Sequence, residues 1–245
     1  MIKIMCMLVV MTMLFACTSN SGSENTGSEN TTTEETPVEV FLETRTEVSA
    51  DNAFRVEYQV DTNTNKKHGL FKEFDVASGQ LLAERTYNMD KIDGVEKLYF
   101  PDTPAVDGIM TYKDGKHHGE FSYFYRNGQL KQKGEFVDGT IEGLLIGYYE
   151  DGTPKEEITH VDGMTQGPFK EYNPNGTLKA EGEFTSKQDQ ENLEHGLLKL
   201  YDENGELNKK MICKQGQCCT IWTVEDGDVE PSSKLCQAII SSHKE

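Results

Sequence analysis

The residues that could do chemistry in this sequence recur at fixed distances from six glycines. The glycines are Gly69, Gly94, Gly119, Gly143, Gly167 and Gly196. An aromatic residue stands five positions after each glycine, and a lysine stands three positions after four of them. Residues two positions apart on a β-strand share one face, and lysine and tyrosine each combine an apolar body with a polar tip. We therefore predict a binding surface, although lysine stems that only shield the rings would give the same pattern. Its members are Lys72, Phe74, Lys97, Tyr99, Phe124, Tyr148, Lys170, Tyr172, Lys199 and Tyr201.

Three histidines, His68, His118 and His195, each directly precede one of these glycines. Equivalent residues one hairpin apart in a sheet are separated by roughly 9 to 10 Å, whereas the ligands of one metal ion lie about 2 Å from it. We therefore predict a turn or packing role for these histidines and no metal site. The sequence also lacks G-x-S-x-G, H-E-x-x-H and a phosphate-binding glycine loop. It predicts no catalytic residue and no cofactor.

Four cysteines, Cys213, Cys218, Cys219 and Cys236, lie close to the C-terminus. In an exported chain such a group favours disulfides, and the paired CxxC spacing of a zinc cluster is missing. Adjacent cysteines rarely bridge each other, so two pairings remain open. Cys213 pairs with Cys218 and Cys219 with Cys236, or Cys213 pairs with Cys219 and Cys218 with Cys236.

Export is predicted by the first 16 residues, in which one cation is followed by an apolar run shorter than the roughly 20 residues that span a bilayer. The segment Leu14-Phe15-Ala16-Cys17 resembles the lipobox of bacterial lipoproteins. This resemblance implies a lipid-anchored chain that begins at Cys17. Thr18 in place of Asp after that cysteine implies delivery to the outer membrane, facing the periplasm or the cell surface. Plain secretion is the alternative.

Charge and composition restrict the partners. The chain has 24 Lys and Arg against 42 Asp and Glu, a formal net charge of −18. Polyanions are repelled by such a chain, so we predict no nucleic acid partner and no membrane contact beyond the lipid anchor. Residues 17–37 carry almost no apolar side chain and predict a disordered tether.

The elements that position the lysines and rings are predicted by the repeat itself. Phe or Leu stands two positions after each glycine, with Glu96 as the exception, and Asn-Gly or Asp-Gly follows the aromatic in four of the six units. These pairs tolerate positive φ, and we predict two-residue type I′ turns there, with a second turn such as Asp138-Gly139 closing each unit. Gly134 and Gly182 on the return strands are predicted to leave room for rings. Because a lone hairpin is marginal, the units should stack side by side with rings of successive repeats in contact.

The predicted fold class is therefore all-β, an elongated antiparallel meander of about six hairpin repeats over residues 69–216. Strands within residues 38–68 cap its first edge, and residues 217–245 form a short disulfide-stapled cap. Part of this cap has the pattern of a small helix, with Ser232 or Ser233 as N-cap. The face of this helix that turns to the sheet consists of Leu235, Cys236, Ile239 and Ile240.

The pattern G-x-[FL]-x-x-[FY]-x-x-[ND]-G-x-L over residues 69–216 resembles the variant class of MORN repeats found in bacterial proteins. This motif encodes hairpin geometry and no chemistry, and some relatives carry an antitoxin label. The resemblance implies a non-enzymatic module that binds a protein or an envelope glycan. The alternatives are an antitoxin or immunity protein that neutralises a toxin, a structural spacer and, least favoured, a hydrolase built around the loop Ser186–Glu194.

Overall fold

The computed structural model of the chain describes residues 39–187, 190–231 and 233–243. Of the two units into which the chain divides, the fold given below is that of the second, Val40–Glu245. The predicted signal peptide, Cys17 and the tether lie outside the described residues.

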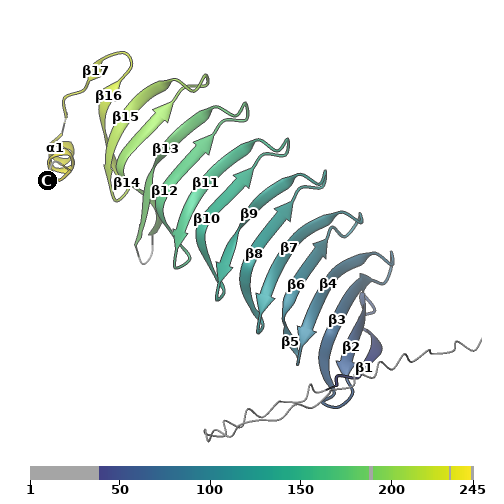
Figure 1. Ribbon diagram of the computed structural model, residues 1–245. Helices are drawn as coiled ribbons and strands as arrows, with labels where there is room; N and C mark the ends of the chain where they lie inside the picture. Colours follow the sequence, from purple (N-terminus) through teal and green to yellow (C-terminus); the bar gives the residue numbers. More distant parts are fainter. Residues whose placement is uncertain (1–38, 188–189, 232, 244–245) are drawn as a thin grey trace, which may run out of the picture. The chain divides into compact units, whose positions relative to one another are not determined.

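The second unit is a single antiparallel sheet of 17 strands followed by a short helix (Figure 1). Each strand pairs with the next strand along the chain, except that β5 and β6 do not pair with each other and lie in tandem beside β4. The all-β meander predicted from the repeat is confirmed. Its elements are β1 (Leu42–Val48), β2 (Phe54–Asp61), β3 (Lys66–Asp75), β4 (Leu81–Asn88), β5 (Lys91–Ile92), β6 (Gly94–Tyr99), β7 (Val106–Lys113), β8 (Lys116–Phe124), β9 (Leu130–Val137), β10 (Thr140–Tyr148), β11 (Pro154–Val161), β12 (Met164–Tyr172), β13 (Leu178–Lys187), β14 (Gln190–Tyr201), β15 (Leu207–Lys214), β16 (Gln217–Thr223), β17 (Gly227–Asp228) and α1 (Lys234–Ser241).

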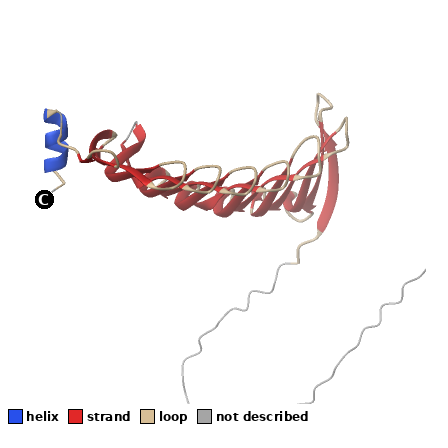
Figure 2. Cartoon of the chain, turned by 90° about the horizontal axis from the view of Figure 1, so that it is seen from above, coloured by secondary structure: helices blue, strands red, loops and turns tan. Residues whose placement is uncertain are grey.

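The sheet is one curved layer, and among the described elements no second layer lies against either of its faces (Figure 2). Its apolar residues are buried along one face in three separate clusters instead of one central core. We call this the phenylalanine face, because it carries the residue two positions after each repeat glycine. These residues are Phe71, Glu96, Phe121, Leu145, Phe169 and Leu198.

Glycine on the return strand allows neighbouring repeats to meet on the phenylalanine face. A Cβ atom on Gly134 would lie 2.9 Å from Cε1 of Phe121 and 3.0 Å from Cδ1 of Leu145. Real Cβ atoms do not come so close, so the ring of one repeat and the leucine of the next repeat meet only because this position has no side chain. The predicted role of Gly134 is confirmed. Gly182 stands in the same relation to Phe169.

Contrary to the prediction, most ring contacts do not join successive repeats. They lie on the phenylalanine face and form mainly within one hairpin, as between Phe121 and Phe136, whose centroids are 4.7 Å apart, and between Phe169 and Phe184 at 3.9 Å. Equivalent positions of adjacent repeats are two strands apart, about 9.5 Å, which exceeds the 4.5 to 7 Å of paired rings. Leucines such as Leu145 therefore make the contact between repeats.

The type I′ turns occur at the second set of turns, not at the predicted one. Asp138 and Gly139 both have positive φ, 50° and 96°, and join directly paired strand ends as a two-residue type I′ turn does. In the Asn127-Gly128 pair only the glycine has positive φ, 84°, and its N–H donates to the carbonyl of Tyr125 at 2.9 Å. This is the longer hairpin loop in which a left-handed glycine follows the turn. The prediction of type I′ turns at the Asn-Gly pairs was wrong.

One polar cluster interrupts the phenylalanine face in the second repeat. The Glu96 residue is only 4% exposed and forms an ion pair with Nε of Arg85. Tyr112 donates its hydroxyl to the other Glu96 oxygen at 3.0 Å, and Nη1 of Arg85 lies 2.9 Å from Oε2 of Glu73. Burial of Tyr112, followed by its bond to Glu96, raises the pKa of the tyrosine. Each oxygen of the buried Glu96 carboxylate thus has a hydrogen-bond donor, which offsets part of the cost of removing the charge from water.

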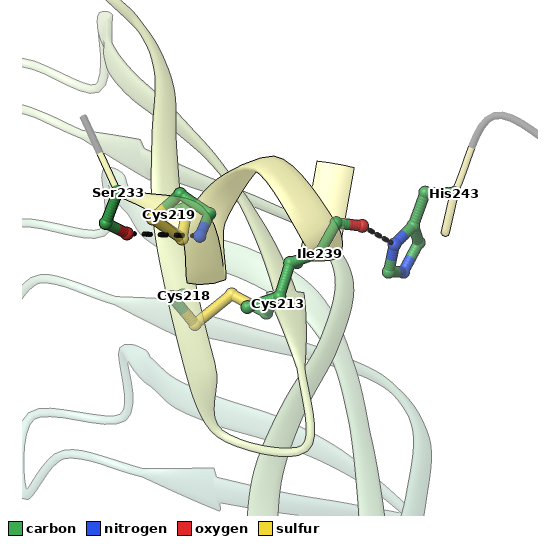
Figure 3. The surroundings of a disulfide bond; sticks show 7 residues. Cys213, Cys218, Cys219, Ser233, Ile239 and His243 are labelled. Carbon is green, nitrogen blue, oxygen red and sulfur yellow. Dashed lines mark hydrogen bonds between the residues drawn. A yellow bond between two sulfur atoms is a disulfide. The ribbon is translucent and has the colours of Figure 1, made fainter. Parts of the chain in front are cut away.

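The last repeat ends in two disulfides, Cys213–Cys218 and Cys219–Cys236 (Figure 3). This is the first of the two pairings left open by the sequence. Cys213 is fully buried and takes the place on β15 that Phe184 takes on β13. The Cys213–Cys218 disulfide therefore occupies the position at which an earlier repeat has the ring of Phe184.

Helix α1 is attached to β16 by the Cys219–Cys236 disulfide (Figure 3). Ser233 is its N-cap, since its hydroxyl accepts from the N–H of Cys236 at 3.1 Å, as predicted. Ile239 is 3% exposed and lies against the sheet. Leu235, predicted to share that face, is 52% exposed. The disulfide turns Cys236 and Ile239 towards the strands and leaves Leu235 at the margin of the contact.

Candidate functional site

The predicted lysines lie on the face opposite the phenylalanine face, which we call the Lys/Tyr face. Strand register places them in a single row that crosses the sheet from β2 to β16, with one residue from each strand except β5. We call it the central row. In order, it consists of Glu57, Lys72, Glu84, Lys97, Ile109, Ser122, Lys133, Ile146, Glu157, Lys170, Glu181, Lys199, Lys210 and Trp222.

Near the start of the row, one glutamate holds both a lysine and a tyrosine. Tyr99 donates its hydroxyl to Oε2 of Glu84 at 2.8 Å, and Nζ of Lys72 lies 3.3 Å from Oε1. Burial, and then the bond to Glu84, raise the pKa of Tyr99 to about 12. The same bond, helped by Lys72, lowers the pKa of Glu84. At neutral pH the glutamate is therefore charged and the hydroxyl keeps its proton.

A glutamate holds a tyrosine at two more places towards the C-terminal end, and at one of them, Glu181, it also holds a lysine. Tyr172 donates to Glu157 at 3.0 Å, and Tyr201 donates to Glu181 at 2.7 Å. Lys199 also lies 2.7 Å from Glu181, and this lysine is the main cause of the lowered pKa of that carboxyl. Burial and the glutamate raise the pKa of Tyr201 to about 12. In each copy a glutamate from a return strand orients the tyrosine of the following outgoing strand.

The centre of the row has a different character. Ile109, Ser122 and Ile146, with Lys133 between the last two, stand between stretches of the row in which Glu and Lys mostly alternate. Both isoleucines are half-buried. The neighbouring ring of Phe124 has no hydroxyl to be held by a glutamate. Beside this segment lies a shallow depression of about 420 Å³. Its side chains include Glu120, Ser122, Lys133, Glu135, Glu142 and Leu144.

All ten residues of the predicted surface belong to the Lys/Tyr face. Lys97 and Lys170 are exposed, and the other eight are half-buried. Sequence reasoning missed the glutamates of the row, since these belong to return strands whose register the repeat spacing does not give. A signal was present, however, because Glu84 and Glu181 each stand three positions after the first leucine of their strand.

Within the described part of the chain, no group of three or more His, Cys, Asp or Glu side chains could hold a metal ion. Nδ1 of His118 lies 3.6 Å from Oδ1 of Asp138, and the ring of His117 stacks on the ring of Phe136. The segment predicted as a loop, Ser186–Glu194, is corrected by the structure, because its described residues belong to β13 and β14.

Comparison with known families identifies the repeat. Four segments match the MORN repeat variant, residues 118–138, 141–162, 165–185 and 194–212. They correspond to the successive hairpins from β8 to β15. No curated protein shows a significant match to the chain. The first two units, which lie outside the matches, contain the exceptions Glu96 and Thr103-Pro104. Four consecutive hairpins of the sheet thus match the variant class of MORN repeats.

Proposed function

We propose that the protein is a lipid-anchored binding module whose Lys/Tyr face takes up a partner protein. MORN repeats are commonly binding modules, and this supports a binding role. The observation that carries the proposal is the central row, in which side chains of fixed orientation flank a centre of two isoleucines, one serine and a single charge, Lys133, next to a depression. Orientation before binding reduces the entropy lost when a partner docks.

The composition of the row favours a protein over a glycan as the partner. Interfaces between proteins have an apolar centre depleted of charge and a polar rim. Ile109 and Ile146 supply such a centre, and the Lys–Glu–Tyr groups on either side supply such a rim. A sugar site would use exposed aromatic faces, whereas the rings of this face are half-buried. The partner expected is therefore a protein with a small apolar patch surrounded by charges.

Replacing both central isoleucines by threonine should abolish capture of this partner. Ile109→Thr/Ile146→Thr keeps two β-branched residues on the strands and removes apolar surface at the centre of the row. Loss of two central contacts should weaken binding at least about tenfold. The measurement is cross-linking in native envelopes, identification of the captured protein, and titration of that purified protein with each variant.

The matched control is Val161→Thr/Val224→Thr, since both valines are exposed and lie outside the central row. This control should bind as the unaltered protein does. Equal capture by the isoleucine variant would contradict the proposal. Enrichment of a glycan in place of a protein would reject the choice of partner, and enrichment of nothing specific would leave the sheet as a spacer.

We also propose that Cys17 carries the lipid and anchors the protein in the outer membrane, on the strength of the lipobox-like segment. Among the described residues, no helix has the length and apolar character needed to cross a membrane. Each buried CH₂ of an acyl chain contributes about 0.8 kcal/mol to membrane binding. Cys17→Ser should therefore move the protein from the membrane fraction to the soluble fraction and stop fatty-acid labelling. Cys6→Ser, which alters a cysteine of the predicted signal peptide, should leave both unchanged. A labelled, membrane-bound Cys17→Ser variant would refute the anchor.

A further inference from the structure

The two ends of the sheet are closed differently. At the C-terminal end, α1 is linked by a disulfide to β16 and lies beside the last strands. At the other end, β1 pairs with β2 on one side, and no described strand pairs with its other side (Figure 1). Six of its seven residues are exposed, and it contains neither proline nor lysine, which usually protect an edge strand from pairing. An open edge of this kind is a template for another strand.

The backbone of β1 shows which residues would make the new bonds. The N–H of Thr62 donates to the carbonyl of Phe41 at 2.9 Å, and the N–H of Ser49 donates to that of Phe54 at 2.8 Å. In an antiparallel pair the residues that bond to the partner alternate along the strand. The odd-numbered residues of β1 therefore bond to β2. The even-numbered residues point their N–H and C=O groups outwards, and they are Leu42, Thr44, Thr46 and Val48.

We propose that two copies of the protein pair antiparallel through β1, with the two-fold axis at Thr44. In this register, the backbone of Leu42 in one copy bonds to that of Thr46 in the other. The backbones of the two Thr44 residues, one from each copy, bond to each other. Glu43 of each copy then lies opposite Arg45 of the other, at a position where side chains are closest. The exposed Val40 and Val48, at 43% and 51%, also meet across the interface.

Other registers fit less well. An axis at Arg45 would place Arg45 against Arg45 and Glu43 against Glu47, and like charges directly opposite each other destabilise a sheet. With an axis at Thr46, the pairing would extend beyond Val48, where β1 ends. It would also place Arg45 opposite Glu47, whose carboxylate already accepts the hydroxyl of Tyr58. Within one copy, Arg45 and Glu43 lie 3.6 Å apart as an ion pair. In the Thr44 register each of these residues exchanges this partner for the one on the other copy. The two-fold contact uses both open edges, so the assembly stops at a dimer.

Charge reversal tests this register directly. Arg45→Glu places glutamate against glutamate and Glu43→Arg places arginine against arginine, so each variant alone should dissociate at least tenfold more readily than the unaltered dimer. A mixture of the two variants places every glutamate opposite an arginine again. We expect the mixture to form a heterodimer, measured by sedimentation equilibrium and by co-purification of differently tagged copies. Lys116→Glu is the matched control, with the same change of charge at the exposed first residue of β8, far from β1.

The possible results distinguish a loss of pairing through β1 from misfolding of the variants and from a failure of the proposed binding function. Recovery in the mixture shows that both variants are folded, and none of the altered residues belongs to the central row of the Lys/Tyr face. A monomeric unaltered protein, or variants that remain dimeric alone, would overturn the pairing. Variants that stay monomeric when mixed, with the far-ultraviolet spectrum of the unaltered sheet, would overturn the Thr44 register.

Discussion

Arg85→Met is expected to lower the free energy of unfolding by about 3 to 5 kcal/mol, the usual effect of removing one partner of a buried ion pair. The reason is Glu96, which the substitution would leave buried on the phenylalanine face with the hydroxyl of Tyr112 as its remaining partner in this cluster. A carboxylate removed from water needs more than one neutral donor to offset its desolvation. Urea denaturation followed by circular dichroism measures the change.

The double variant Arg85→Met/Glu96→Leu should recover most of the loss. Leucine stands at the position of Glu96 in two other repeats, Leu145 and Leu198, so the apolar face would become continuous. Replacing a buried ion pair by packed apolar residues is often neutral or stabilising. The control is Arg126→Met, which removes an exposed pair with Asp102 and should cost no more than about 1 kcal/mol. A double variant less stable than Arg85→Met would show that the cluster has another role.

Removal of the Cys219–Cys236 disulfide should detach α1 from the sheet. The bond joins residues 17 positions apart, and a loop of that size is expected to contribute about 3 kcal/mol by restricting the unfolded chain. Without it, α1 has eight residues, too few for a stable isolated helix, and its main buried contact is Ile239. In Cys219→Ala/Cys236→Ala, the α1 amides should exchange with deuterium at nearly the rate of an unfolded peptide, as measured by mass spectrometry.

Cys213→Ala/Cys218→Ala supplies the comparison. Its disulfide joins two paired strands of one hairpin, and backbone bonds between β15 and β16 maintain that register without it. The hairpin should therefore become less stable while α1 stays protected. If α1 remained protected after loss of Cys219–Cys236, the helix would be held by packing alone, and the disulfide would not be its attachment.

The order of strands could be predicted from the sequence because glycine, ring and turn residues recur in phase. The turn types could not be predicted, because Asn127-Gly128 and Asp138-Gly139 are similar dipeptides and each is compatible with a type I′ turn. The difference between them comes from the number of residues between paired strand ends, which only register reveals. Cysteine pairing stayed open for a related reason, because Cys218 and Cys219 point to opposite faces of β16 and the sequence does not say which face meets Cys236.

The candidate site shows the same limit. Lys72 and Tyr99 were predicted to share a face, and the ion pair of Lys72 and the hydrogen bond of Tyr99, both with Glu84, place them there. Glu84 itself lies on a return strand, and its place between the two depends on cross-strand register rather than on spacing along the chain. Predicted surfaces in such repeats should therefore be read across strands as well as along them.

Because each hairpin of this single-layer sheet rests only on its neighbours, the protein can change size by whole units. Gly119, Gly143 and Gly167 are 24 residues apart, so a gene duplication or deletion of that many codons would join in phase. Each event would lengthen or shorten the sheet by about 9.5 Å, two strand spacings, without disturbing either end. The length of the sheet is thus an inherited property set by the number of repeats. It can evolve separately from the residues that contact a partner.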